Sequence, residues 1–185
     1  MTTGRIELGP TGRTVAANVK RLRGERGLTL RALAAALKEV GRPLSADALN
    51  KIENGAPDTE PGKSGEPKPV RRVDVDDLMA LAVVLQVPVI TLLLPASVRG
   101  FVELTGVGEI RGRIAWRWAQ GRVPLEWPEE ADQEERRKLL AMYLMAATPD
   151  GIGWDQTTQE GQRAAVEVFK GWAEEEGGER GPSVD

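Results

Sequence analysis

The sequence contains no cysteine and no histidine among its 185 residues. Without cysteine there can be no disulfide and no thiolate metal site, which is typical of a cytoplasmic protein. Without histidine the chain lacks the commonest general base, the commonest metal ligand and the usual pH switch near neutrality. No pair of carboxylates in a catalytic pattern replaces them. We therefore expect no enzymatic activity, no catalytic residues, no metal site and no cofactor.

Long apolar runs are also missing from the sequence. No run approaches the ~20 residues that a membrane span requires, and residues 1–12 lack the apolar core of a signal peptide. These absences predict a protein that does not associate with a membrane and is located in the cytoplasm. With 41% hydrophobic and 29% charged residues, the composition is otherwise that of an ordinary soluble protein of one or two small domains.

The sequence has no strong excess of one charge, and its formal net charge is −3. The two halves differ, however: residues 1–95 hold 14 Lys and Arg against 11 Asp and Glu, whereas residues 96–185 hold 11 against 17. The first half is therefore the better suited to contact phosphate groups. Because its excess of three positive charges is modest, local clustering of cations must provide any such surface.

Apolar spacing predicts two successive helices near the start of the chain. Residues 14–26 carry apolar side chains at i, i+4 and i+7, and Gly27 ends this helix. Thr29 caps the second helix, which has an apolar stripe and runs to about Val40. Residues 1–13 are polar and rich in glycine, which predicts a flexible arm that could reach a DNA backbone or minor groove; the alternative is a disordered terminus.

A short third helix is predicted from Ser45 to Asn54. Ser45 can cap it, Leu49 and Ile52 share one face, and Gly55 can supply the left-handed conformation that ends many helices. Its other face carries short or polar side chains, which suits a DNA major groove. Two helices, a connection and a third short helix match a helix-turn-helix.

The sequence resembles the Cro/C1-type (XRE) transcriptional regulators at this point. The resemblance lies in Val19-Lys20-Arg21-Leu22-Arg23, Gly27-Leu28-Thr29-Leu30, Leu33-Ala34 and Ile52-Glu53-Asn54-Gly55. The sequence of residues 71–78 is also similar to that of actinobacterial members of the family. Residues 75–88 and 89–94 look like the fourth and fifth helices of that domain. The resemblance implies an all-α fold, with a five-helix lambda-repressor-like DNA-binding domain over residues 14–95.

The resemblance also implies roles for individual residues. It places Ala46, Asp47 and Lys51 toward the bases, with Asn50 at the margin. Lys51 could donate to guanine, Asp47 could accept from cytosine, and Ala46 could contact a thymine methyl group. The alternative for Asp47 is a favourable anion in the first turn of its helix. Arg23 and Glu53 are implied to form a structural ion pair that joins the first and third helices.

Contacts to the DNA backbone are expected at helix starts and in a loop. The resemblance implies that Thr29 and Arg31 lie over phosphates, and the alternative for Arg31 is a solvated residue. Ser45 is also expected to contact the DNA backbone. The connection between the second and third helices, which contains Lys38 and Arg42, is longer than is usual in the family. Residues 54–72 form an inserted loop rich in Pro and Gly, which could follow the backbone as a wing or be a solvated excursion. Its cations are Lys63, Lys68, Arg71 and Arg72.

All eight aromatic residues lie between residues 96 and 185. We predict a smaller, Trp-rich helical region over 96–176 and a disordered tail over 177–185. We expect a strand or extended linker at 98–104, a turn at 106–112, and helices over 109–120, 128–147 and 157–175. These helices present apolar stripes that must be buried against something. The alternatives are a dimer surface, a site for a small-molecule or protein effector, and a subdomain packed on itself.

Two functions remain open from the sequence. The first is a sequence-specific DNA-binding transcriptional regulator that binds double-stranded DNA with residues 45–54 in the major groove, as a homodimer on a two-fold site. The second is a protein-interaction adaptor, such as an antitoxin-like protein or an anti-regulator, that binds its partner through the Trp-rich half. Steep weakening of DNA binding by salt would separate the first from the second.

Overall fold

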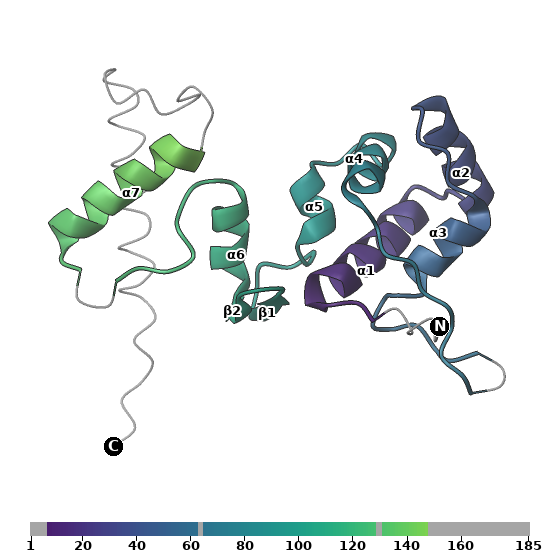
Figure 1. Cartoon of the computed structure of the whole chain (residues 1–185), viewed down its shortest axis with the longest axis horizontal. Coiled ribbons are helices and arrows are strands. Elements are labelled where there is room, and N and C mark those ends of the chain that lie inside the picture. The colour runs from purple at the N-terminus through teal and green to yellow at the C-terminus, as the bar shows by residue number, and fades with distance from the viewer. Residues whose placement is uncertain (1–6, 63–64, 129–130, 148–185) are drawn as a thin grey trace, which may run out of the picture. The chain divides into compact units, whose positions relative to one another are not determined.

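The computed structural model describes residues 7–62, 65–128 and 131–147 (Figure 1). These residues form seven helices and one two-stranded sheet, so the described chain is mostly helical but not all-α. None of the described helices combines the length and the apolar character needed to cross a membrane. The chain divides into two units, Met1–Ala115 and Trp116–Asp185.

Helix α1 covers Pro10–Glu25 and begins four residues earlier than predicted. The prediction of an arm over residues 1–13 is therefore wrong for residues 10–13, and residues 1–6 lie outside the described residues. The reason is Pro10, whose fixed φ suits the first helical position and whose missing N–H is not needed there. Val15, Val19 and Leu22 are buried as the spacing predicted.

Helices α2 (Leu30–Glu39) and α3 (Ala46–Glu53) begin at the predicted caps. The Thr29 hydroxyl accepts a hydrogen bond from the Ala32 amide at 3.1 Å, and the Ser45 hydroxyl accepts one from the Ala48 amide at 3.0 Å. Each bond satisfies one of the free N–H groups of a helix start, and such a cap is worth ~1 kcal/mol. The two caps fix where each helix begins.

Gly55 does not adopt the left-handed conformation predicted for it, and α3 ends through Asn54 in a right-handed conformation. Gly55 is needed for another reason. A Cβ here would collide with the side chain of Leu8 and would lie 3.2 Å from both Ala16 Cβ and the Ile52 carbonyl oxygen. The absence of a side chain lets the end of α3 approach α1 closely.

Helices α4 (Val75–Val84) and α5 (Val89–Leu93) complete the first core. Buried residues of the first four helices pack with Leu85 and with Leu92 of α5 in a single hydrophobic cluster. Asn18 of α1 is also buried, and its Nδ2 donates to the carbonyl oxygens of Leu92 and Leu94 at 3.1 and 2.7 Å. This side chain joins α1 to the end of α5 by hydrogen bonds that water cannot replace.

Gln86, just after α4, has a φ of 49°, a left-handed conformation that costs most residues free energy. We expect Gln86→Gly to raise the free energy of unfolding by about 0.5–1 kcal/mol, because glycine removes this cost but gains freedom in the unfolded chain. Urea unfolding followed by circular dichroism measures the change. Gln86→Ala is the control, since alanine keeps the steric cost and should not stabilise the protein.

After α5 the chain forms an antiparallel hairpin of β1 (Phe101–Leu104) and β2 (Gly108–Arg111). Of the two alternatives predicted for residues 98–104, the strand is present over 101–104. The predictions of a turn over 106–112 and of a helix from residue 109 are wrong for residues 108–111, because these residues pair with β1. Val102 and Leu104 are buried, whereas Phe101 and Glu103 are exposed. The hairpin also contacts α1: the Thr105 amide donates to Thr11 Oγ1 at 3.0 Å. Met1–Ala115 thus includes the hairpin as well as α1–α5.

Helix α6 covers Gly112–Ala119, and the boundary between the two units falls inside it. Helix α7 covers Gln133–Ala147 and buries Leu140 and Leu144. The prediction that α7 begins at Pro128 is wrong: the Asp132 side chain accepts from the Glu135 amide at 2.8 Å and provides the cap instead. The predicted helix over 157–175 and the tail over 177–185 lie outside the described residues.

Candidate nucleic-acid interface

Helix α3 has one buried face and one accessible face. Leu49 and Ile52 are fully buried in the core. Asp47 and Asn50 are exposed, and Ala46 and Lys51 are partly exposed. The four residues that the resemblance assigns to base reading therefore share the part of α3 that is not packed against the domain.

Two of these residues contact each other. Lys51 Nζ lies 2.7 Å from Asp47 Oδ2, one helical turn away, and both side chains are well exposed. Exposed ion pairs of this kind contribute little free energy, so the pair can open at little cost. If Lys51 turned away from Asp47 to donate to a base, the Asp47 carboxylate would remain on the same face of α3. A carboxylate there would repel base edges that present hydrogen-bond acceptors.

Helix α3 is held to α1 by an ion pair between Arg23 and Glu53. Arg23 Nε and Nη2 donate to the two Glu53 carboxylate oxygens at 2.6 and 2.8 Å. The side chains are only 20% and 9% exposed. Arg23 Nη1 also donates to the Leu28 carbonyl oxygen at 2.7 Å, in the connection before α2. The hydrogen bonds to Glu53 raise the pKa of Arg23, so the pair stays charged and fixes the angle of α3.

The helix starts offer two hydroxyl groups and one cation. Thr29 and Ser45 accept amide hydrogen bonds through their oxygens, so each hydroxyl proton remains able to donate to a phosphate. Arg31, in the first turn of α2, is exposed and forms no ion pair with any described residue. Thr29, Ser45 and Arg31, which are predicted to contact the DNA backbone, are therefore accessible to an anion such as a phosphate group.

The inserted loop supplies fewer available cations than predicted. Arg71 is paired with the buried Asp77 at 2.8 Å, which gives it a structural contact, and its role as a phosphate contact stays a prediction. Arg72 is exposed and donates to the Glu7 carbonyl oxygen at 3.2 Å, and Lys68 is exposed. Lys63 lies outside the described residues. Arg72 and Lys68 are the cations of the described loop that face solvent without an acidic partner.

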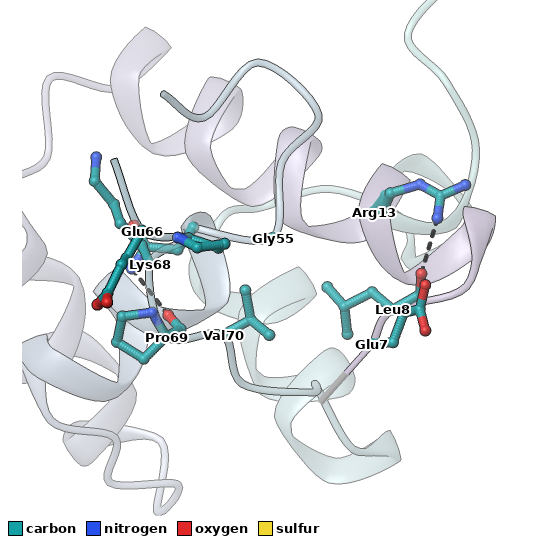
Figure 2. A pocket seen from close by; sticks show the side chains of 10 residues that line it. Glu7, Leu8, Arg13, Gly55, Glu66, Lys68, Pro69 and Val70 are labelled. Carbon is teal, nitrogen blue, oxygen red and sulfur yellow. Dashed lines mark hydrogen bonds between the residues drawn. The ribbon is translucent and has the colours of Figure 1, made fainter. Parts of the chain in front are cut away.

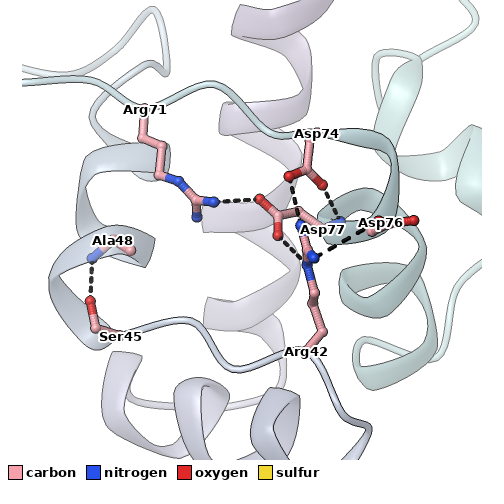
Figure 3. A network of polar contacts seen from close by, with 7 residues as sticks. All are labelled: Arg42, Ser45, Ala48, Arg71, Asp74, Asp76 and Asp77. Atoms are coloured by element: carbon pink, nitrogen blue, oxygen red, sulfur yellow. Dashed lines mark hydrogen bonds and ion pairs between the residues drawn. The ribbon is translucent and has the colours of Figure 1, made fainter.

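A cluster of charged residues that the sequence did not reveal surrounds Asp77 (Figure 3). The Asp77 carboxylate is completely buried and accepts from Arg42 Nε and Arg71 Nη2, each at 2.8 Å. Arg42 also donates to Asp74 at 2.6 Å, and Asp74 accepts from the Asp77 amide at 2.7 Å. That amide, and then the positive charge of Arg42, lower the pKa of Asp74.

This Asp77 cluster joins three segments that are distant in sequence. Arg42 comes from the connection between α2 and α3, Arg71 from the end of the inserted loop, and the acids from the start of α4. The cluster therefore fixes the chain immediately before α3 against α4. A signal was present in the sequence: Asp77, Leu81 and Leu85 recur every four residues, which places Asp77 on the buried face of α4.

The inserted loop returns along the end of α3. The Arg71 amide donates to the Lys51 carbonyl oxygen at 3.0 Å, and Asn54 Nδ2 donates to the Pro69 carbonyl oxygen at 3.0 Å. The first bond satisfies a carbonyl group of the last turn of α3 that the helix leaves free, and the second joins the Asn54 side chain to the loop. At its other end the loop is tied to α1 by the ion pair of Lys20 with Asp58 at 2.9 Å.

A cavity of about 980 Å³ lies between this returning segment and the residues that lead into α1 (Figure 2). Its lining includes Glu7 and Glu66 as well as Arg13 and Lys68. Because acids and bases contribute equally, the cavity has no charge preference for a phosphate group. We therefore do not assign the cavity as a phosphate site, although Lys68, one of its lining residues, is exposed to solvent.

The arrangement provides an accessible face of α3 on a rigid support, and the starts of α2 and α3 add two hydroxyl groups and the Arg31 cation. In the described ranges, no three acidic, cysteine or histidine side chains are grouped so that they could hold a metal ion. A comparison with protein-family models, with curated proteins and with solved structures finds no match to this chain.

Proposed function

We propose that this protein is a sequence-specific DNA-binding transcriptional regulator that inserts α3 into the major groove. The observation that carries the proposal is the way α3 is held. Its apolar face is buried, and the Arg23–Glu53 pair locks it to α1, while Ala46, Asp47, Asn50 and Lys51 stay accessible. A reading helix must keep its position while only its outer side chains contact bases.

The side chains on the accessible face suit base readout. Lys51 donates to O6 and N7 of guanine, and Asn50 can form paired hydrogen bonds with adenine. Asp47 accepts from the amino group of cytosine and repels bases that present acceptors. Ala46 leaves room for a thymine methyl group. Because Asp47 and Lys51 are already paired at 2.7 Å, we propose that they read adjacent bases together.

Phosphate contacts position this face on the duplex. Thr29, Ser45 and Arg31 lie at the starts of α2 and α3, and Lys68 and Arg72 extend the contact beside α3. The order of α1–α5 and the ion pair between the first and third helices support the resemblance to the lambda-repressor-like domain of Cro/C1-type regulators. One such domain makes few contacts, so the proposal includes a homodimer on a two-fold DNA site.

We expect Lys51→Ala to weaken binding to the preferred DNA by about tenfold to a hundredfold, because one base contact is worth ~1–3 kcal/mol. The preferred DNA is obtained by selecting from random duplexes with the full chain. Affinity is then measured by fluorescence anisotropy on the selected duplex and on a scrambled duplex, at two salt concentrations. Binding to the scrambled duplex should change little, since that binding depends on phosphates.

Lys138→Ala is a matched control. Lys138 forms an exposed ion pair with Glu134 one helical turn away, at 2.9 Å, as Lys51 does with Asp47, but it lies on α7. It should leave both affinities unchanged. If selection enriches no sequence, and binding to all duplexes is equally weak, the regulator is excluded and the adaptor becomes the better proposal.

A further inference from the structure

We propose that the outer edge of β2 pairs with β2 of a second copy of this chain, antiparallel and centred on Ile110. The described part of the chain supplies no third strand for this sheet, which has the order β1–β2. An open strand edge presents backbone groups that can pair with another strand. The proposal names a surface for the dimer included in the proposed function.

The hydrogen-bond pattern determines which groups of β2 point outward. The Gly112 amide donates to the Gly100 carbonyl oxygen at 2.9 Å, and these two residues continue the register in which Val102 faces Ile110. In an antiparallel pair, directly opposed residues alternate between bonded and non-bonded. The amide and carbonyl groups of Ile110 therefore point toward β1. Those of Glu109 and Arg111 point away from β1, at the outer edge of the sheet.

This pattern fits a two-fold axis at Ile110. With the axis there, Glu109 of one copy faces Arg111 of the other, and both residues have outward backbone groups. Each such pair can exchange two hydrogen bonds, as the bonded positions of an antiparallel ladder do. The axis generates the pair twice, so four backbone hydrogen bonds join the two copies.

The side chains of the edge are self-complementary in charge. Glu109 and Arg111 are both exposed, so the two-fold axis brings each carboxylate beside a guanidinium. Within its own hairpin, Glu109 faces Glu103, a like-charged pair that disfavours an isolated hairpin. Arg13 lies 3.5 Å from Glu103, and a second copy would place a cation beside Glu109. Arg111 also lies over the Phe101 ring, 5.9 Å from its centre, which holds its stem on this face.

The other edge of the sheet is less suitable. The loop that follows β1 is bonded to α1 through Thr11 and Thr105, and the exposed Glu103 of β1 pairs with Arg13 of α1. Helix α1 thus lies against β1. A strand that approached from this side would meet the helix, so β2 is the edge at which a second copy fits.

Charge exchange tests the proposal directly. The full chain, Glu109→Arg, Arg111→Glu and the double variant Glu109→Arg/Arg111→Glu are compared by sedimentation equilibrium without DNA. We expect wild type to dimerise and each single variant to dimerise at least about tenfold more weakly, because two symmetry-related pairs change from attraction to repulsion. The double variant, and an equimolar mixture of the two single variants, should restore the dimer, since opposite charges again face each other.

Arg99→Glu is the control for the net charge of Arg111→Glu: it makes the same change of −2 on an exposed residue outside the paired strands, and should leave the dimer intact. Circular dichroism checks that each variant is folded. A monomeric wild type, or a dimer that the single variants do not weaken, would overturn the proposal. Because association is measured without DNA, this result is independent of whether α3 reads a DNA sequence.

Discussion

Replacing Asp77 with asparagine should lower the free energy of unfolding by about 3 kcal/mol, since removing one partner of a buried ion pair costs ~3–5 kcal/mol. We expect the lower end because Arg42 and Arg71 keep some access to water. Asparagine has nearly the same shape as aspartate, so no cavity forms. Its amide oxygen can accept from one arginine, but its NH₂ group must then face the other guanidinium, which also only donates.

Asp76→Asn provides the matched control for this prediction. Asp76 is one residue away, its carboxylate is 3.8 Å from the same Arg42, and its side chain is 83% exposed. It should leave the stability almost unchanged, because exposed ion pairs contribute little. Urea unfolding of both variants, followed by circular dichroism, makes the comparison. Equal losses in the two variants would mean that the Asp77 cluster is no more than surface charge.

The Asp77 substitution should also affect α3. Arg42 precedes the Ser45 cap, and the Arg71 amide is bonded to the Lys51 carbonyl oxygen. Loss of the buried anion frees both arginines, so the start and end of α3 lose a support. If α3 reads DNA, selective affinity should fall even under conditions where Asp77→Asn remains folded.

Local signals in the sequence predicted the helices of the first half well. Thr29 and Ser45 each accept from an amide three residues away, so their capping role can be read from the sequence alone. Apolar spacing likewise predicted the buried residues of α1 to α3. Such features depend on few neighbours, and tertiary contacts do not override them here.

Features that depend on distant partners were predicted poorly. The ion pairs of Asp77 cannot be predicted from the sequence, because nothing near Asp77 in the chain shows that Arg42 and Arg71 converge on it. Gly55 was assigned a helix-ending conformation, although what it provides is space for Leu8 and Ala16. In both cases the residue type matters for the fold, but the contact that requires it comes from a segment distant in sequence.

The hairpin shows the same limit in secondary structure. The sequence predicts a turn over 106–112 and a helix from residue 109, whereas residues 108–111 form a strand, since a four-residue strand carries almost no periodic signal of its own. Pairing with Phe101–Leu104 decides their conformation. For α7, Pro128 and the acids after it resembled a helix start, yet Asp132 provides the observed cap.

The Arg23–Glu53 pair should contribute a large coupling energy between α1 and α3. We expect Arg23→Gln and Glu53→Gln each to lower the free energy of unfolding by about 3 kcal/mol, because each leaves a mostly buried charge without its partner. The free energy of unfolding should fall by much less in the double variant than by the sum of the two single losses, since no unpaired charge remains. Urea unfolding of the four proteins gives the coupling energy, which we expect to be ~2–3 kcal/mol.

The pair of Lys20 with Asp58 is the comparison within the same domain. It also joins α1 to a distant segment, at 2.9 Å, but its side chains are exposed. The Lys20 hydrogen bond lowers the pKa of Asp58, so the pair is charged near neutral pH. The cycle of Lys20→Gln and Asp58→Asn should nevertheless show almost no coupling, because water screens the charges. If both cycles gave the same small coupling, the contact of α3 with α1 would depend on apolar packing, and the proposed rigid support for base reading would lose its main polar link to α1.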